Sequence, residues 1–242
     1  MKDREQKHFD RISEKYHKAS DSWKIIYEQI EERINPLITD RVVLDVGNGG
    51  MFAYDLDRPS RILVMDVSVD MLSSISDARV TKIVSDARDM CTIENDSVDV
   101  IIFVLVLHHI SGNNLHESIK TLEGILSEAR SKLRPGGHLV VAEALLSPIL
   151  FRVQKWCFQL TRAILHRLGV SMIFFCTQAI LAENIAKVFE INYQDIETTD
   201  LNLEGWLDPL GGCFPGLIKI PVSMQPWDFR LMIAKKTSYD NH

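Results

Sequence analysis

The segment from Val42 to Gly50 constrains the fold of this chain more than any other. Residues 42–46 form a short apolar run of the kind that makes a buried strand, and three glycines follow within the next four positions. Glycine lets the backbone approach a ligand where a Cβ atom would clash. A buried strand that runs into a glycine-rich turn is the usual start of a nucleotide-binding α/β domain. The segment therefore predicts an α/β fold with a ligand site at the carboxyl end of this strand.

Further short apolar runs follow the first one, and helical patterns lie between them. The run over residues 99–107 has the profile of a central parallel strand that is buried on both faces. Alternation of strands and helices predicts a parallel sheet wound on both faces, with ligands at the carboxyl ends of its strands. The expected strands are 62–65, 82–84, 99–107 and 138–143, and the expected helix before the last of these is 115–133.

Polar side chains stand where the predicted strands end. Asp66 follows the second strand, 21 residues after Asp45, which is close to the spacing at which a carboxylate accepts hydrogen bonds from both hydroxyls of a ribose. Asp86 follows the third strand, and His108 and His109 follow the fourth. The alternative for each acid is a helix cap or a solvated loop residue.

Four segments together resemble the class I S-adenosylmethionine-dependent methyltransferases of the type-11 group, which includes ubiquinone-biosynthesis-like enzymes. The order and spacing of these segments over residues 40–143 are more specific than any one of them. An NAD-binding domain shares the glycines and the second-strand acid, but not the aspartate after strand three together with a Pro-Gly-Gly turn before strand five. The matching segments are 43–49, 64–72, 85–110 and 133–137.

The resemblance implies a doubly wound, Rossmann-like α/β fold. Its seven-stranded sheet would be mostly parallel, with an antiparallel last strand, and a helical lid would be inserted in it. The cofactor would be S-adenosyl-L-methionine, which leaves as S-adenosyl-L-homocysteine. Asp66 would hold the ribose, Val67 would lie against the adenine and Asp86 would accept from the adenine amino group. The implied cofactor-binding residues are Asp45, Gly47, Asn48, Gly49, Asp66, Val67, Met71, Asp86, Ala87 and Leu105.

The chain departs from the family pattern at Met51, where a third glycine is usual. That glycine permits close packing of the next helix on the sheet. Residues 51–60 are also a poor helix sequence, because Asp55, Asp57 and Pro59 fall within them. We therefore expect an irregular connection here.

His108 and His109 are the candidate catalytic residues. An unperturbed histidine titrates near neutral pH, so either one could take a proton from a hydroxyl or ammonium acceptor. If the strand is still extended at this point, only one of the two side chains can readily point into the pocket. The alternative is that the pair is only a common structural ending of the strand.

We interpret residues 1–242 as a single methyltransferase domain. A helix over residues 8–35 is expected to end at Asn35-Pro36. Thr177 is expected to cap a helix that reaches Val188, followed by strands at 191–196 and 229–234. Residues 205–226 are rich in glycine and proline and predict a loop with no regular element. The expected segments are an N-terminal helical part (1–36), a cofactor-binding core (40–146), a helical lid (147–187) and C-terminal strands with the long loop (188–237).

The lid sequence combines two stripes at helical spacing. Arg152, Lys155, Gln159, Arg162 and His166 make a basic stripe, and Val153, Trp156, Leu160 and Ile164 lie on an apolar face. Three interpretations stay open: a lid over an apolar substrate, a surface helix attracted to anionic lipid, or a helix docked on the sheet with a solvated basic face. The candidate substrate contacts are Tyr16, Trp156, Trp206 and Phe214.

The amino-acid composition limits the classes of binding partner that we expect. The net charge of −6 carries no electrostatic footprint for nucleic acid, so a small molecule is the expected partner. The four cysteines form no CxxC pair, which favours packing roles, no metal site and a reducing, cytoplasmic setting. We find no signal peptide and no apolar run long enough to span a bilayer. A monomer or a homodimer is expected.

The sequence thus predicts an enzyme that transfers a methyl group from S-adenosylmethionine to a small, apolar or amphiphilic acceptor. Oxygen is the favoured methylated atom, ahead of nitrogen and carbon. The alternative from another class is a regulatory or scaffold protein that binds S-adenosylmethionine without methyl transfer. An NAD-dependent oxidoreductase is a third hypothesis.

Overall fold

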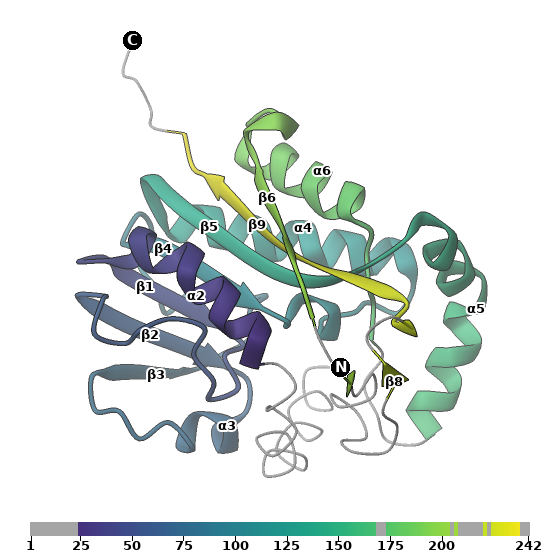
Figure 1. The fold of residues 1–242 in the computed structure, drawn as a ribbon, viewed down its shortest axis with the longest axis horizontal. Coiled ribbons are helices and arrows are strands. Elements are labelled where there is room, and N and C mark those ends of the chain that lie inside the picture. The colour runs from purple at the N-terminus through teal and green to yellow at the C-terminus, as the bar shows by residue number, and fades with distance from the viewer. Residues whose placement is uncertain (1–23, 168–172, 204–205, 208–219, 222–223, 238–242) are drawn as a thin grey trace.

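A seven-stranded sheet forms the centre of the protein in a computed structural model, which describes residues 24–167, 173–203, 206–207, 220–221 and 224–237 (Figure 1). The strand order is β3-β2-β1-β4-β5-β9-β6. Strands β1 to β5 pair in parallel, and β9 runs antiparallel to both of its neighbours, β5 and β6. The strands are β1 (Val42–Val46), β2 (Arg61–Asp66), β3 (Val80–Val84), β4 (Val98–Val104), β5 (Leu133–Leu146), β6 (Glu197–Leu201) and β9 (Trp227–Lys235). This confirms the predicted fold class.

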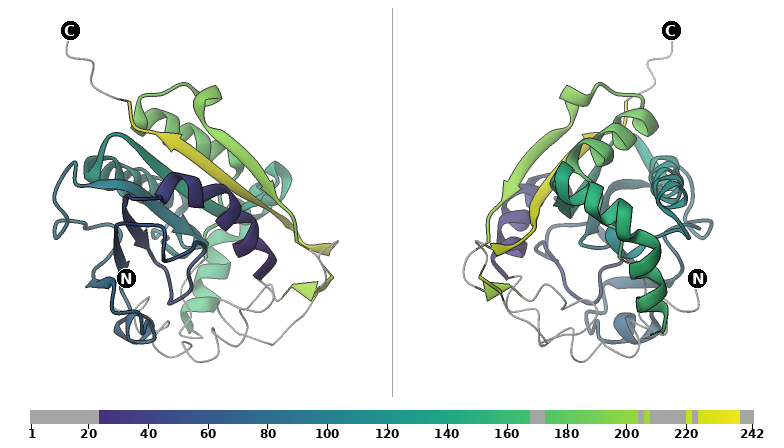
Figure 2. Two further views of the ribbon diagram at one scale, coloured as in Figure 1. Left: turned by 60° about the vertical axis from the view of Figure 1, so that its left-hand side comes forward. Right: turned by 90° about the vertical axis from the view of Figure 1, so that its right-hand side faces the viewer.

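Helices cover both faces of the sheet. Helix α2 lies on one face, and α4 and α6 lie side by side on the other, while α5 lies at one end of the molecule (Figures 1 and 2). The helices are α2 (Lys24–Ile38), α3 (Val69–Ser73), α4 (Leu115–Lys132), α5 (Pro148–Arg167) and α6 (Gln178–Phe189), with short 3-10 turns η2 (Leu107–His109) and η3 (Tyr193–Asp195). As predicted, the side chain of Thr177 caps α6 by accepting from the N–H of Ile180.

The apolar runs of the central strands are continuous because both faces of the sheet are covered. Leu44 and Ile101 pack toward α4 and α6, whereas the alternate residues Val43 and Val100 pack toward α2. On α2, isoleucines spaced four apart make the contact, and all of them are fully buried: Ile26, Ile30, Ile34 and Ile38. The core therefore has two layers, one on each side of the sheet.

The expected end of the first helix at Asn35-Pro36 is wrong, because α2 continues through Pro36 to Ile38. Proline removes one backbone donor, but this loss falls in the last turn of the helix. Ile34 and Ile38 on either side of it are fully buried against the sheet, and their burial outweighs the missing hydrogen bond. Residues 8–23 of the expected helix lie outside the described residues.

The connection between β1 and β2 contains only turns and bends, which confirms the irregular segment expected after Met51. Ala53 and Tyr54 are buried in the α2 layer of the core. Phe52 and Leu56 pack against the small cluster that contains Leu72 of α3. Side chains of the loop thus fill the space that a packed helix would take.

Residues 134–137 lie within β5 rather than in a turn between helix and strand, which corrects the expected order. Helix α4 ends at Lys132, and the pairing of β5 with β4 then jumps from Leu133 to His138 across a bulge. A Cβ atom at Gly137 would stand 2.9 Å from the carbonyl oxygens of Asp99 and Arg134. Glycine is needed here because backbones meet, not because a helix ends.

Two C-terminal expectations also change. The strand expected at 191–196 starts later, at Glu197, because Asn192 and Asp195 form a reciprocal capping box around η3. Within residues 205–226, β7 (Trp206–Leu207) pairs with β8 (Ile220–Pro221), so a short regular element exists where none was expected. No helix among the described residues is long and apolar enough to cross a membrane.

The cysteines differ in their surroundings. Cys91 is exposed, which corrects its expected packing role, while Cys157 and Cys176 are half-buried. Burial raises the pKa of Cys176 to about 12, so this thiol stays protonated at neutral pH. Cys213 lies outside the described residues.

Candidate active site

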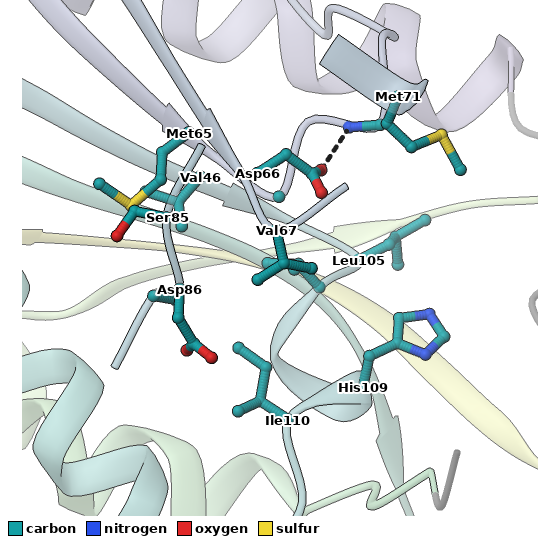
Figure 3. Close-up of a pocket in the computed structure, with 14 residues that line it drawn as sticks. Val46, Met65, Asp66, Val67, Met71, Ser85, Asp86, Leu105, His109 and Ile110 are labelled. Carbon is teal, nitrogen blue, oxygen red and sulfur yellow. Dashed lines mark hydrogen bonds between the residues drawn. The ribbon is translucent and has the colours of Figure 1, made fainter. Parts of the chain in front are cut away.

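A cavity of about 660 Å³, its open mouth included, lies at the carboxyl ends of β1, β2, β3 and β4 (Figure 3). The structure brings most of the predicted cofactor residues to its wall: Gly47, Gly49, Asp66, Val67, Met71, Asp86, Ala87 and Leu105. His109 also lines it. The sequence argument did not single out the remaining wall residues, Val46, Met65, Ser85, Val106 and Ile110. These residues are next to the motif residues in the sequence, so their position at the strand ends could have identified them.

Asp66 links the β2 end to the glycine turn after β1. One carboxylate oxygen accepts from the N–H of Ser68 at 2.8 Å, and the other accepts from the N–H of Gly49 at 3.3 Å. Asp66 is thus a buried carboxylate, held on the cavity wall between the two loops that it joins.

Asp86 is held from behind by Arg88. The guanidinium donates to both carboxylate oxygens, at 2.8 Å and 2.6 Å, and the backbone N–H of Arg88 adds a third bond at 2.9 Å. This paired contact fixes the carboxylate and offsets its charge. Arg88 was not predicted as a site residue, although it follows Asp86 by only two positions in the sequence.

Figure 3 shows the carboxyl groups of Asp66 and Asp86 on one side of the cavity and Leu105 with His109 on the other. Leu105 has a left-handed backbone with φ +53°, and its N–H donates to the carbonyl of Ala142 at 2.8 Å. This conformation turns the chain out of β4 before η2 begins. Backbone strain of this kind is common at functional sites.

Asp45 and Asn48 are not among the residues that line the cavity, and their contact with the cofactor stays a prediction. The side-chain amide of Asn48 donates at 2.6 Å to both the Asp45 carboxylate and the carbonyl of Met51, and its oxygen accepts from Gly50 N–H. The pair is buried beneath the glycine turn. Their bonds are directed into the loop, so they shape the turn from behind.

Burial raises the pKa of Asp45 to about 7, against opposing contributions from the Asn48 and Tyr54 side chains. The folded protein therefore keeps a proton that the unfolded chain releases near pH 4, so the free energy of unfolding falls as pH rises between about 4 and 7. Asp45→Asn retains an acceptor for Asn48 but has no such proton. Between these pH values, the free energy of unfolding should fall by up to roughly 4 kcal/mol less in Asp45→Asn than in the wild type. Thermal unfolding of both proteins across these pH values measures the difference, and parallel curves would contradict it.

Gly47 allows the turn to pass next to Val106. Its φ is +70°, and a Cβ atom there would stand 2.1 Å from a Val106 methyl. We expect Gly47→Ala to lower the free energy of unfolding by roughly 2 to 4 kcal/mol, from left-handed strain and overpacking together, and to weaken cofactor binding. A matched control is Gly124→Ala in α4, where a Cβ atom meets nothing within 4 Å and the helix should gain about 0.5 to 1 kcal/mol. Chemical denaturation measures the free energy of unfolding of both variants. Equal changes in the two variants would refute the packing argument.

The two histidines lie in η2, after the strand as expected, although β4 ends at Val104 and not at Leu107. His109 is buried on the cavity wall. The His108 ring packs against it, with centroids 4.1 Å apart, and its Nδ1 lies 2.8 Å from a carboxylate oxygen of Glu143 on β5. The other Glu143 oxygen accepts from the N–H of Leu107 at 2.9 Å. Glu143 is 2% exposed, so the sheet fixes the orientation of His108.

An aromatic stack extends from His108. The ring of Phe175 stacks on it with centroids 5.0 Å apart, and Trp227 stacks on Phe175 at 5.5 Å. A backbone bond from Phe174 N–H to the carbonyl of His108, at 2.8 Å, brings the segment before α6 to η2. The sequence argument missed Glu143 and Phe175 as site residues, because contacts between such distant positions leave no local pattern.

Trp156 is the predicted substrate contact whose side chain the structure describes. It lies on α5 and is 88% exposed, and its contact with a substrate stays a prediction. The apolar face of α5 likewise points to solvent, not over the cavity as expected of a lid. Tyr16 and Phe214 lie outside the described residues, as does the side chain of Trp206 in β7. Among the described residues, no group of three or more His, Cys, Asp or Glu is arranged to hold a metal ion.

Comparison with known proteins gives the class of this fold and site. Residues 44–141 match the type-11 family described as a methyltransferase domain. A chain from the complex of the Haloferax volcanii Trm112 methyltransferase activator has a TM-score of 0.64 at 15% identity, with 98% of this chain and 99% of that chain covered. A possible histamine N-methyltransferase from Thermotoga maritima has a TM-score of 0.61 at 15% identity, with 96% and 100% covered. No curated protein matches the chain in sequence.

A third structure is geranyl diphosphate C-methyltransferase from Streptomyces coelicolor, crystallised with S-adenosylhomocysteine. It has a TM-score of 0.58 at 14% identity, with 86% of this chain and 78% of that chain covered. The fold is that of Rossmann-like methyltransferases. Residues 44–141 therefore form a methyltransferase domain, and the chain as a whole has the fold of S-adenosylmethionine-dependent methyltransferases.

The cavity residues fit this cofactor. A buried carboxylate at Asp66 suits the hydroxyls of a ribose, and apolar side chains on the wall, Val67, Leu105 and Ile110, suit a flat base. The Asp66 carboxylate also suits a cofactor that carries positive charge on its sulfonium and amino groups. S-adenosylmethionine supplies an activated methyl group, and the protein supplies alignment.

Proposed function

We propose that this methyltransferase methylates a hydroxyl oxygen of a small, apolar or amphiphilic acceptor, with His108 as the general base. The hydrogen bond between His108 and the buried Glu143 carries the proposal. A carboxylate that accepts from Nδ1–H keeps the ring proton on Nδ1. Nε2 of His108 is then left with a lone pair that can take a proton from the acceptor as its oxygen attacks.

The surroundings of His108 support an apolar acceptor. Phe175 and Trp227 are both half-buried and stack in line with the His108 ring. Flat apolar or aromatic groups bind well against such faces. His109 lies between this stack and the cofactor cavity, because it contacts His108 and lines the cavity. An acceptor whose hydroxyl reaches Nε2 of His108 would therefore lie next to His109, on the side of the cofactor cavity.

Nitrogen and carbon are the competing methylated atoms. One structural neighbour is named as a possible histamine N-methyltransferase and another as a geranyl diphosphate C-methyltransferase. A neutral amine can attack the methyl group before it loses a proton, whereas a hydroxyl oxygen becomes a good nucleophile only as its proton is removed. The Glu143–His108 pair therefore favours oxygen over an unprotonated amine.

The test is transfer of a radiolabelled methyl group from S-adenosylmethionine to a panel of apolar phenols, hydroxy acids and amines, with product structure determined by NMR. We expect label on the oxygen of phenols or hydroxy acids. Label confined to nitrogen or carbon would contradict oxygen methylation. Tight cofactor binding without any transfer to the panel or to a cell extract would favour the non-catalytic regulatory protein instead.

A further inference from the structure

Helix α5 carries a stripe of large apolar side chains on its outer face. Each of them is at least 50% exposed: Ile149, Val153, Trp156, Leu160 and Ile164. At 3.6 residues per turn, these positions fall within an arc of about 80°. Contiguous exposed apolar surface of this kind on a soluble fold marks a site of interaction. We call this set the α5 stripe.

The charges of α5 have one sign. The helix contains four Lys or Arg residues and no Asp or Glu, although the whole chain has a net charge of −6. Arg152, Lys155 and His166 are exposed, and the helical repeat places all three on the same flank of the α5 stripe. A cationic flank beside an apolar stripe complements a surface that is both anionic and apolar.

Contacts on the inner face fix the outward direction of the α5 stripe. Phe158 is the buried residue of the helix. The side chain of Gln154 donates to the carbonyl of Phe175 at 2.7 Å and accepts from its N–H at 3.1 Å. Arg162 donates to the side chain of Asn113 at 2.7 Å. The stripe therefore points away from the rest of the protein, and Figure 1 shows α5 itself at the edge of the molecule.

We propose that α5 is an interfacial helix that binds the surface of an anionic lipid bilayer, with the α5 stripe inserted among the acyl chains. Trp156, the most exposed member of the stripe, is the residue type favoured at membrane interfaces. Arg152 and Lys155 would contact lipid phosphates. The acidic remainder of the protein would be repelled by such a surface, so α5 also sets the orientation. Because β5 leads from Glu143 into α5, the active-site end of the sheet would face the bilayer.

Vesicle sedimentation with the full-length protein tests this proposal without any methyl acceptor. We expect at least tenfold more protein on vesicles of phosphatidylcholine mixed with phosphatidylglycerol than on phosphatidylcholine alone, with release at high salt. Leu160→Glu should abolish binding. Arg152→Gln combined with Lys155→Gln should weaken vesicle binding about 30-fold, because two basic residues that each favour binding to an anionic surface are lost together. Met224→Glu, at an exposed apolar residue outside α5, should bind like the wild type.

Circular dichroism and S-adenosylmethionine binding establish that each variant is folded, and these measurements separate this proposal from the proposed acceptor chemistry. Equal binding to both vesicle types, or to neither, would overturn the proposal. Wild-type binding by Leu160→Glu would also overturn it. A dimer in light scattering that Leu160→Glu dissociates, without vesicle binding, would assign the α5 stripe to a second copy of the chain instead.

Discussion

Replacing Asp66 with alanine should weaken the binding of S-adenosylmethionine by roughly 10²- to 10⁴-fold, because two hydrogen bonds to a charged group would be lost and each contributes about 1.5 to 3 kcal/mol. Asp66 is buried at the end of β2 and lines the cavity, where a carboxylate suits the two hydroxyls of a ribose. Isothermal titration calorimetry of wild type and variant measures the loss.

The matched control is Asp70→Ala. Asp70 is an exposed carboxylate in the first turn of α3, four residues from Asp66, and its removal should leave the affinity within about twofold. Asp66→Asn keeps one acceptor oxygen, so its affinity for S-adenosylmethionine should lie between those of the wild type and Asp66→Ala. A folded Asp66→Ala protein with wild-type affinity would show that the ribose is held elsewhere.

Replacing Glu143 with glutamine should lower kcat by roughly 10²- to 10³-fold, within the range of general-base contributions. The glutamine oxygen can still accept from Leu107 N–H, but its NH₂ group would donate to Nδ1 of His108. The proton of the ring would then move to Nε2, and His108 could no longer accept one there. Turnover of an acceptor from the labelled-methyl screen, measured at saturating substrate, gives the loss in kcat.

This effect is distinguishable from a loss of structure. Glu143 does not line the cofactor cavity, so the affinity for S-adenosylmethionine should stay unchanged in Glu143→Gln. His108→Gln should lower kcat by a similar factor, and the double variant should lose little more, because the two residues act as one unit. Additive losses, or a wild-type kcat in Glu143→Gln, would contradict the assigned role.

The parallel strands of the sheet could be predicted from the sequence because each strand is marked by a local pattern of apolar residues. Strands β1 to β5 are apolar runs separated by helices or turns, and a parallel sheet collects their carboxyl ends at one edge. Asp66 and Asp86 therefore reached the cavity as expected. Met51 and the acids after it likewise indicated a connection without a helix.

The remaining features depend on contacts that no local pattern records. Periodicity grouped Trp156 with the other apolar residues of α5 but could not show which way that face points. The partner of His108 is Glu143, 35 residues away on a neighbouring strand. Phe175 reaches the same histidine through the segment before α6. Asp45 has the right residue type at the right place, but Asn48 and burial give it a role beneath the turn.

The most direct test of the central claim is calorimetric titration of the wild-type protein with S-adenosylmethionine, S-adenosylhomocysteine and NAD. If the cavity at the strand ends is the cofactor site, both sulfur compounds should bind with a Kd in the micromolar range and NAD should not compete. Preference for NAD, or no binding of S-adenosylmethionine and S-adenosylhomocysteine by folded protein, would contradict the account.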